Sequence, residues 1–127
     1  MKFREFYTTS NKLVLCGKSA ETNEELIKTS IKPDEIVLHT KAAGSPFCVI
    51  KGKASQDDIK ETAIICAAHS KAWKSSKSNI EVHYFHGKDI CKEKGMKLGT
   101  FSVKKAKSLV AKKSQILNLI QQIQKTK

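Results

Sequence analysis

The stretch from residue 70 to 77 brings hydroxyl groups, lysine ammonium groups and the only tryptophan of the chain close together in the sequence. Hydroxyl and lysine side chains commonly contact the phosphates of nucleic acids, and a tryptophan ring can stack on an unpaired base. The alternative for a lone tryptophan is a place in the hydrophobic core. We predict a nucleic-acid contact here, formed by Ser70, Lys71, Trp73, Ser76 and Lys77.

A second candidate pair lies at the end of the strand-like run over residues 36–40. His39 and Lys41 are two residues apart, so in an extended strand their side chains share one face. His39 could be a structural histidine, a nucleic-acid contact or a general base, and the last role would need an orienting carboxylate, for which Glu35 is the candidate. We predict that His39 and Lys41 contact nucleic acid, that the chain has no catalytic residue, and that it is not an enzyme.

The sequence shows no metal-binding or cofactor-binding motif. The sequence has no glycine-rich phosphate loop of a known type and no GxSxG nucleophile motif. Its four cysteines are widely spaced, and His83 and His86, three apart in a strand, would point to opposite faces. Cys16, Cys48 and Cys66 lie in apolar runs and are predicted to be small buried hydrophobic residues of a reduced protein. We expect no metal and no cofactor.

Positive charge dominates the chain, with 24 lysine and arginine residues against 12 acidic residues. Arg4 is the only arginine, and lysine suits phosphate contact better than bidentate recognition of bases. The charge is concentrated in residues 88–127, which hold 11 lysines and two acidic residues. This asymmetry favours a polyanionic partner, although a solubilising tail, an acidic protein or a membrane surface would also fit. Further phosphate contacts are predicted at Lys97, Lys104, Lys105 and Lys107.

The length of 127 residues is typical of one domain. Apolar alternation, turn residues and capping residues define the elements that must position these side chains. The expected strands are residues 2–7, 12–16, 36–40, 47–51, 80–86 and 100–103, and the expected helices are residues 19–30 and 56–73. Strands 2–7 and 12–16, and strands 36–40 and 47–51, are expected to form hairpins. Because the elements are interspersed without strict βαβ alternation, we predict an α+β domain with a mostly antiparallel sheet over residues 1–111.

Residues 112–127 are predicted to form a basic, amphipathic tail. Ile116, Leu119, Ile120 and Ile123 have helical spacing, but a helix this short is unstable alone in water. Three arrangements stay open: docking on the same domain, pairing with a second copy or a partner protein, and disorder.

Four short stretches carry a combination of motifs whose order and spacing are specific. They are residues 17–20 with 23–26, residues 35–41 with 44–46, residues 67–73, and residues 94–96 with 98–101. Together they resemble the NFACT-R domain, the RNA-binding module of Rqc2/NEMF/FbpA-type proteins. The resemblance covers roughly residues 3–111 and implies an α+β fold, RNA binding, and Lys18 and Asn23 as further RNA contacts. Lys18, Glu35 and Val37 depart from the arginine, aspartate and aromatic residue usual in this family.

These observations predict a stand-alone, non-enzymatic RNA-binding domain that acts on tRNA or rRNA in translation or ribosome-associated quality control. Recognition would rest on lysine–phosphate contacts and on shape more than sequence. No run is apolar enough to span a membrane and no signal peptide is evident, so we expect a cytoplasmic protein without a membrane partner. The alternatives are a protein-interaction adaptor in the same setting and an enzyme acting on a phosphorylated or nucleotide substrate.

Overall fold

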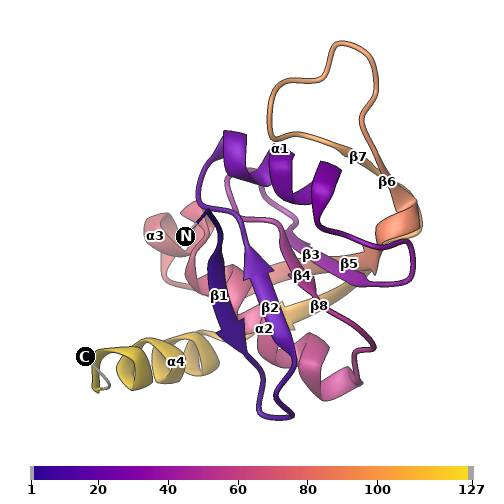
Figure 1. Cartoon of the computed structure of the whole chain (residues 1–127). Helices are drawn as coiled ribbons and strands as arrows, with labels where there is room; N and C mark the ends of the chain where they lie inside the picture. Colours follow the sequence, from indigo (N-terminus) through magenta and orange to yellow (C-terminus); the bar gives the residue numbers. More distant parts are fainter. Residues whose placement is uncertain (1, 126–127) are drawn as a thin grey trace.

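Short strands and helices alternate along the chain in a computed structural model that describes residues 2–125, with side chains described up to residue 122 (Figure 1). The strands are β1 (Arg4–Tyr7), β2 (Leu13–Cys16), β3 (Ile36–Thr40), β4 (Cys48–Ile50), β5 (Ile80–His86), β6 (Ile90–Cys91), β7 (Ser102–Val103) and β8 (Lys107–Ala111). The helices are α1 (Ala20–Thr29), α2 (Gln56–Ala68), α3 (Lys71–Ser76) and α4 (Lys113–Lys125), with a 3-10 turn η1 over Gly87–Asp89. Of the helices in this described part, none is long and apolar enough to cross a lipid bilayer.

Six of the strands form one antiparallel sheet in the order β1-β2-β4-β3-β5-β8, and β6 pairs with β7 in a separate small sheet. Both expected hairpins are confirmed, because β1 pairs with β2 and β3 pairs with β4. Strand β4 also pairs with β2, which joins the two hairpins into one sheet. The predicted α+β class with a mostly antiparallel sheet is therefore confirmed.

The six-stranded sheet lies between helices, and the side chains of each strand alternate between its two faces (Figure 1). On one face, Leu38 of β3 and Ile59 of α2 belong to one buried cluster. On the other, Val37 of β3 and Phe85 of β5 are buried in a second cluster with Leu26 of α1. Helices α1 and α2 are capped by the serines that the capping pattern indicates, Ser19 and Ser55. The side chain of each serine accepts a hydrogen bond from a backbone amide of the first turn.

Three of the cysteines meet in the core. Cys16, Cys48 and Cys66 are buried, as predicted, and burial together with the neighbouring thiols of Cys16 and Cys66 raises the pKa of Cys48. The thiols therefore act as small apolar side chains. Within the described residues, no three His, Cys, Asp or Glu side chains are grouped as metal ligands.

The helix expected over residues 56–73 is wrong in its extent, because the chain breaks after Ala68 into α2 and α3. Ser70 caps α3: its hydroxyl accepts a hydrogen bond from the amide of Trp73 at 3.1 Å and donates one to the carbonyl of Ala67 at 2.6 Å. Residues 69–73 contain no proline or glycine, so no helix breaker in the sequence marks the interruption.

The C-terminal part also differs from expectation. The strand expected over residues 100–103 shrinks to β7, and the basic segment that follows enters an unexpected edge strand, β8, paired with β5. The tail forms α4 and docks on its own domain, because Ile116 is fully buried in the α2 cluster and Leu119 and Ile120 pack against it. The side chain of Ile123 lies outside the described residues. The domain boundary after Ala111 stays a prediction.

Candidate nucleic-acid interface

A depression of about 650 Å³ lies on the α1 side of the sheet, next to the cluster that packs beneath that helix. Phe47, Phe85, Phe101 and Val103 belong both to this cluster and to the lining of the depression. The walls come from segments far apart in sequence: the start of β1, the connection into α1, the end of β3 with the turn after it, α3, and residues 98–106. The depression is thus a product of the whole fold.

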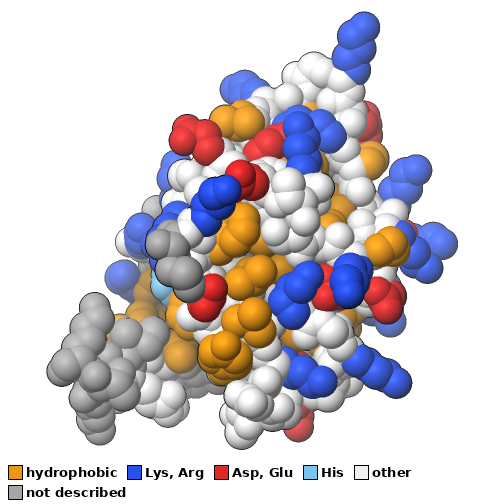
Figure 2. All heavy atoms as spheres, in the orientation of Figure 1, with side chains coloured by type: hydrophobic (Ala, Val, Ile, Leu, Met, Phe, Trp, Pro, Cys, Tyr) orange, Lys and Arg blue, Asp and Glu red, His pale blue; other side chains and the backbone are white. Residues whose placement is uncertain are grey.

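The side chains around this depression carry an excess of positive charge. The basic lining residues are Arg4, Lys18, Lys41, Lys71 and Lys74, joined by His39, His69 and His83. Among the described residues that line it, none is acidic. On the face shown in Figure 2, by contrast, basic and acidic side chains are interspersed. The converging cations make the depression a site where an anion is attracted.

His39 lies half-buried at the depression, held by its neighbours. Its ring packs on Phe47 with 4.2 Å between the ring centroids, and its Nδ1 lies 2.8 Å from the carbonyl oxygen of Thr40. Burial, with the adjacent His83, lowers the pKa of His39 below its usual range, although the Thr40 carbonyl opposes this. The ring is therefore neutral at pH 7. Since a carbonyl only accepts, Nδ1 carries the proton and Nε2 is left as a hydrogen-bond acceptor.

The carboxylate that a general base would need is engaged elsewhere. Glu35 is buried and accepts hydrogen bonds from Lys51 Nζ at 2.7 Å and from the amide of Gly52 at 2.8 Å. Burial alone would raise the pKa of Glu35, but these bonds outweigh it and lower the pKa. Glu35, the candidate carboxylate for the general-base alternative, is therefore not beside His39, because Lys51 holds it.

The turn after β3 brings Lys41 and Lys71 to the same depression. The backbone amide of Lys71 donates a hydrogen bond to the carbonyl of Gly44 at 2.9 Å, which joins the turn to α3. Gly44 has a φ of 91°, and a Cβ placed there would lie 2.6 Å from the Lys71 side chain. Only glycine meets both conditions easily. The position of Lys71 therefore depends on a glycine at residue 44 in this turn.

Asn23 supports the floor of the depression from α1. Its Oδ1 accepts a hydrogen bond from the backbone amide of Phe47 at 3.0 Å, and the Phe47 carbonyl accepts one from the amide of Gly17. These bonds fix the connection that carries Lys18 beside Phe47, the residue that precedes β4. Asn23 lines the depression, but its carbonyl oxygen is already committed to positioning the backbone.

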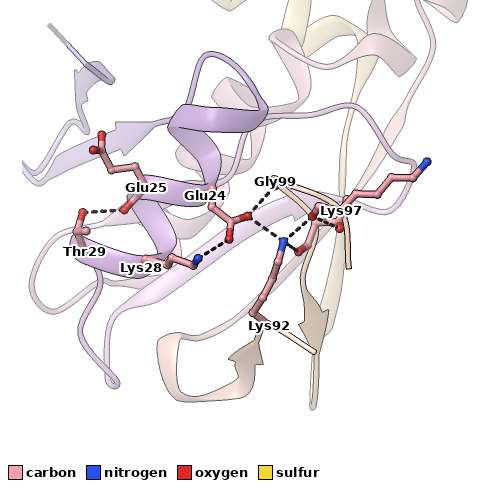
Figure 3. A network of polar contacts seen from close by, with 8 residues as sticks. Glu24, Glu25, Lys28, Thr29, Lys92, Lys97 and Gly99 are labelled. Carbon is pink, nitrogen blue, oxygen red and sulfur yellow. Dashed lines mark hydrogen bonds and ion pairs between the residues drawn. The ribbon is translucent and has the colours of Figure 1, made fainter. Parts of the chain in front are cut away.

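A buried carboxylate holds the segment 92–101 against α1 (Figure 3). Glu24 accepts hydrogen bonds from Lys92 Nζ at 2.9 Å and from the amide of Gly99 at 2.7 Å, and pairs with Lys28 at 2.9 Å. The bond from Lys92, then that from Gly99, hold the pKa of Glu24 at about 2 despite burial, which would raise it. Because Gly99 and Phe101 line the depression, this network fixes one of its walls.

Comparison with known proteins identifies the family. A sequence profile described as the NFACT protein RNA binding domain matches residues 2–105. The chain belongs to the NFACT RNA-binding domain family. A solved structure, the C-terminal part of the fibronectin/fibrinogen-binding protein from Streptococcus suis, matches with a TM-score of 0.81 at 24% identity, over 93% of this chain and 49% of that one. That similarity shows the same fold.

Relatives of this NFACT domain include much longer proteins. The archaeal Rqc2 homolog aRqcH of Methanocaldococcus jannaschii is 36% identical over 99 residues, 72% of this chain and 15% of its own length. The Rqc2 homolog RqcH of Bacillus subtilis is 34% identical over 95 residues, 74% of this chain and 16% of its own length. The human ribosome quality control complex subunit NEMF is 28% identical over 76 residues, 57% of this chain and 7% of its own length. The chain thus spans a small part of each relative.

The structure of the NFACT domain brings some of the expected site residues together. Lys18, Asn23, His39, Lys41 and Lys71 all line the one depression. They come from three of the four stretches that carry the family resemblance. Their role as RNA contacts stays a prediction, now attached to a defined surface.

Two expected contacts are wrong, because their side chains are buried. Trp73 is 2% exposed within the core cluster, so it has no face for a base to stack on. Ser70 is fully buried and its hydroxyl caps α3, so it is not available to a phosphate. Lys77 lies at the other end of α3 with its ammonium 5.1 Å from the Trp73 ring centroid.

The remaining candidates are exposed but outside the lining of the depression. These are Ser76, Lys77, Lys97, Lys104, Lys105 and Lys107. Residues 98–101 and Ala106 do line it, so Lys97, Lys105 and Lys107 stand next in sequence to the rim. They remain predicted phosphate contacts.

Sequence reasoning missed several lining residues. Arg4 and Lys74 reach the depression only because β1 pairs with β2 at Cys16 and because α3 begins beside the turn that follows β3. No local motif marks Arg4, whereas Lys74 lies within the stretch 70–77 but is not among the contacts predicted there. His83 could have been found, since it lies opposite His39 once β3 and β5 are paired.

Proposed function

We propose that this NFACT domain binds RNA through the depression, as a binding module for tRNA or rRNA in ribosome quality control. The observation that supports it is the convergence of five basic side chains from separate segments on a depression of about 650 Å³ whose described lining holds no acidic residue. The family supports RNA as the anion. The relatives named as ribosome quality control proteins support the setting.

Lysine would make this recognition largely a matter of phosphate position. Four of the five basic lining residues are lysines, which act as point charges and do not form bidentate hydrogen bonds with base edges. Phosphate contacts set the register of an RNA without reporting its sequence. The domain would therefore distinguish RNAs by the spacing of phosphates around the depression, which is a feature of RNA shape.

The domain would act by binding and not by catalysis. The sequence offers His39 as a candidate general base, but its Nδ1 donates to a backbone carbonyl, and Glu35 pairs with Lys51 instead. A catalytic histidine is usually oriented by a third group, and a carboxylate in that place also stabilises the imidazolium that forms, which the neutral carbonyl of Thr40 does less well. His83, which also lines the depression, lies 3.2 Å from the Glu81 carboxylate. However, this exposed carboxylate also accepts a hydrogen bond from Ser108 and lies beside Lys41. The geometry at His39 supports a contact residue.

The test measures affinity for a tRNA by fluorescence anisotropy over a series of salt concentrations. Replacing Lys41 and Lys71 with alanine should weaken binding and flatten the log–log salt dependence by about 1.4–1.8, at about 0.7–0.9 per lost phosphate contact. The matched control replaces Lys53 and Lys60, which are exposed but lie outside the depression. Equal effects in both variants would refute the assignment of the depression. Failure of the wild-type protein to bind any RNA would refute the function.

A further inference from the structure

The floor of the depression is a stack of aromatic rings. Phe47 is 3% exposed and forms a T-shaped pair with Phe101, with 5.5 Å between the ring centroids and the rings at 89°. His39 packs on Phe47 at 4.2 Å and an interplanar angle of 31°. Of these three rings, Phe47 is held from two sides, so it supports His39 as a rigid, half-exposed ring at the site.

The rim of the same depression is cationic. Lys41 directly follows β3, which carries His39. The side chain of Lys71 lies over Gly44, in the turn that follows β3. Both lysines are exposed, and Lys41 Nζ lies 3.9 Å from the Glu81 carboxylate in an exposed ion pair, a kind that contributes little and that a phosphate can replace. An aromatic floor below a cationic rim matches the two parts of a nucleotide, which are a planar base and a charged phosphate.

The size of the depression decides which form of RNA can enter it. Sites that enclose small molecules have volumes of about 300–1,000 Å³, and this one, at about 650 Å³, lies within that range. A paired base stays stacked inside the helix, so its flat face is not available to a ring of the protein. A single unpaired nucleotide can present both its base and its phosphate.

We infer that the depression holds one unpaired nucleotide, with its base on the His39 ring and its phosphate between Lys41 and Lys71. This inference rests on the proposed RNA-binding function and narrows it to RNAs that offer a single-stranded or looped-out nucleotide. The Nδ1–H group of His39 donates a hydrogen bond to the Thr40 carbonyl, so Nε2 accepts a hydrogen bond in the plane of the ring, from the ribose 2′-hydroxyl of the bound nucleotide.

The test compares oligouridylate with its duplex formed with oligoadenylate of the same length, by anisotropy at one salt concentration. The wild-type protein should prefer the single strand. His39→Ala should weaken single-strand binding by ~5- to 150-fold, the fold-change that the loss of one base stack gives, and leave duplex binding unchanged. His39→Phe keeps a ring on Phe47 and should retain most of the single-strand preference. The matched control is His86→Ala, an exposed histidine outside the depression, which should change neither affinity.

A second measurement does not depend on the folding of any variant. Titration of the wild-type protein with oligouridylate should shift the NMR ring signals of His39 and leave those of His86 in place. Equal affinity for single strand and duplex, with no shift at His39, would overturn the inference while the RNA-binding function stands. Absence of binding to either RNA would overturn both.

Discussion

The Glu24 network gives a prediction whose magnitude follows from the structure (Figure 3). Glu24→Gln keeps the shape of the side chain but removes the charge that Lys92 and Lys28 bond to, in a residue that is 6% exposed. The pKa of Glu24 is lowered from 4.5 to about 2. At 1.36 kcal/mol for each pKa unit, the charged form is favoured by about 3 kcal/mol, an upper limit for the loss of stability in the variant. For a chain of this length that loss corresponds to a fall in Tm of up to about 10 °C.

The assay is urea unfolding of both proteins at several pH values. Because the folded-state pKa of Glu24 is depressed, its contribution is fully present above the ordinary value of 4.5 and is lost as pH falls toward 2. The wild-type protein should therefore lose stability over this range, and Glu24→Gln should lose less. The matched control is Glu25→Gln on the same helix. Its ion pair with Lys2 is exposed and should change the free energy of unfolding by less than about 1 kcal/mol.

The same substitution should also loosen the wall of the depression. Without the carboxylate, Lys92 and the amide of Gly99 lose the partner that holds residues 92–101 to α1. Hydrogen exchange of the Gly99 amide should become faster in Glu24→Gln, and RNA affinity should fall with it. A variant that matches Glu25→Gln in stability, pH dependence and exchange at Gly99 would refute this account of the network.

Three further predictions concern stability. Deleting residues 114–127 should lower Tm by several degrees, because Ile116 is fully buried and such burial contributes about 1.5–3 kcal/mol. An unchanged Tm by calorimetry would show that the tail does not stabilise the domain. Asp58→Asn should cost about 2 kcal/mol in urea unfolding at pH 7 and remove the acid loss between about pH 4 and 2. Burial would raise the pKa of Asp58, but hydrogen bonds, first from Ser10, hold it at about 2; unaltered acid unfolding would contradict this. Ser70→Ala should cost about 1 kcal/mol by removing the cap of α3, and thermal melts indistinguishable from wild type would count against that role.

Local chemistry made much of the fold predictable from the sequence. The capping serines, the turn residues and the apolar alternation act between near neighbours, so both hairpins and the starts of α1 and α2 are confirmed. Strand spacing and the clustering of hydroxyl and lysine side chains placed His39, Lys41 and Lys71 among the candidates, and they meet at the depression.

Long-range contacts decided what the sequence could not predict. Strand β8 exists because β5 offers its edge, and residues 104–107 look like any basic linker. Trp73 is buried because the break at Ser70 turns α3 back onto the core. Arg4 reaches the site through strand pairing alone. Each of these outcomes depends on where a distant segment lies, and no local pattern carries that information.

The central claim is that the depression at the end of β3 is the surface that binds RNA. The most direct measurement is a ¹H–¹⁵N NMR titration of the protein with a tRNA-derived stem-loop. We predict that the largest amide shifts occur at Lys18, Lys41, Gly44 and Lys71, which surround the depression. Shifts confined to residues 104–113 or to α4, with these four amides unchanged, would contradict the account and place the interface on the basic C-terminal third.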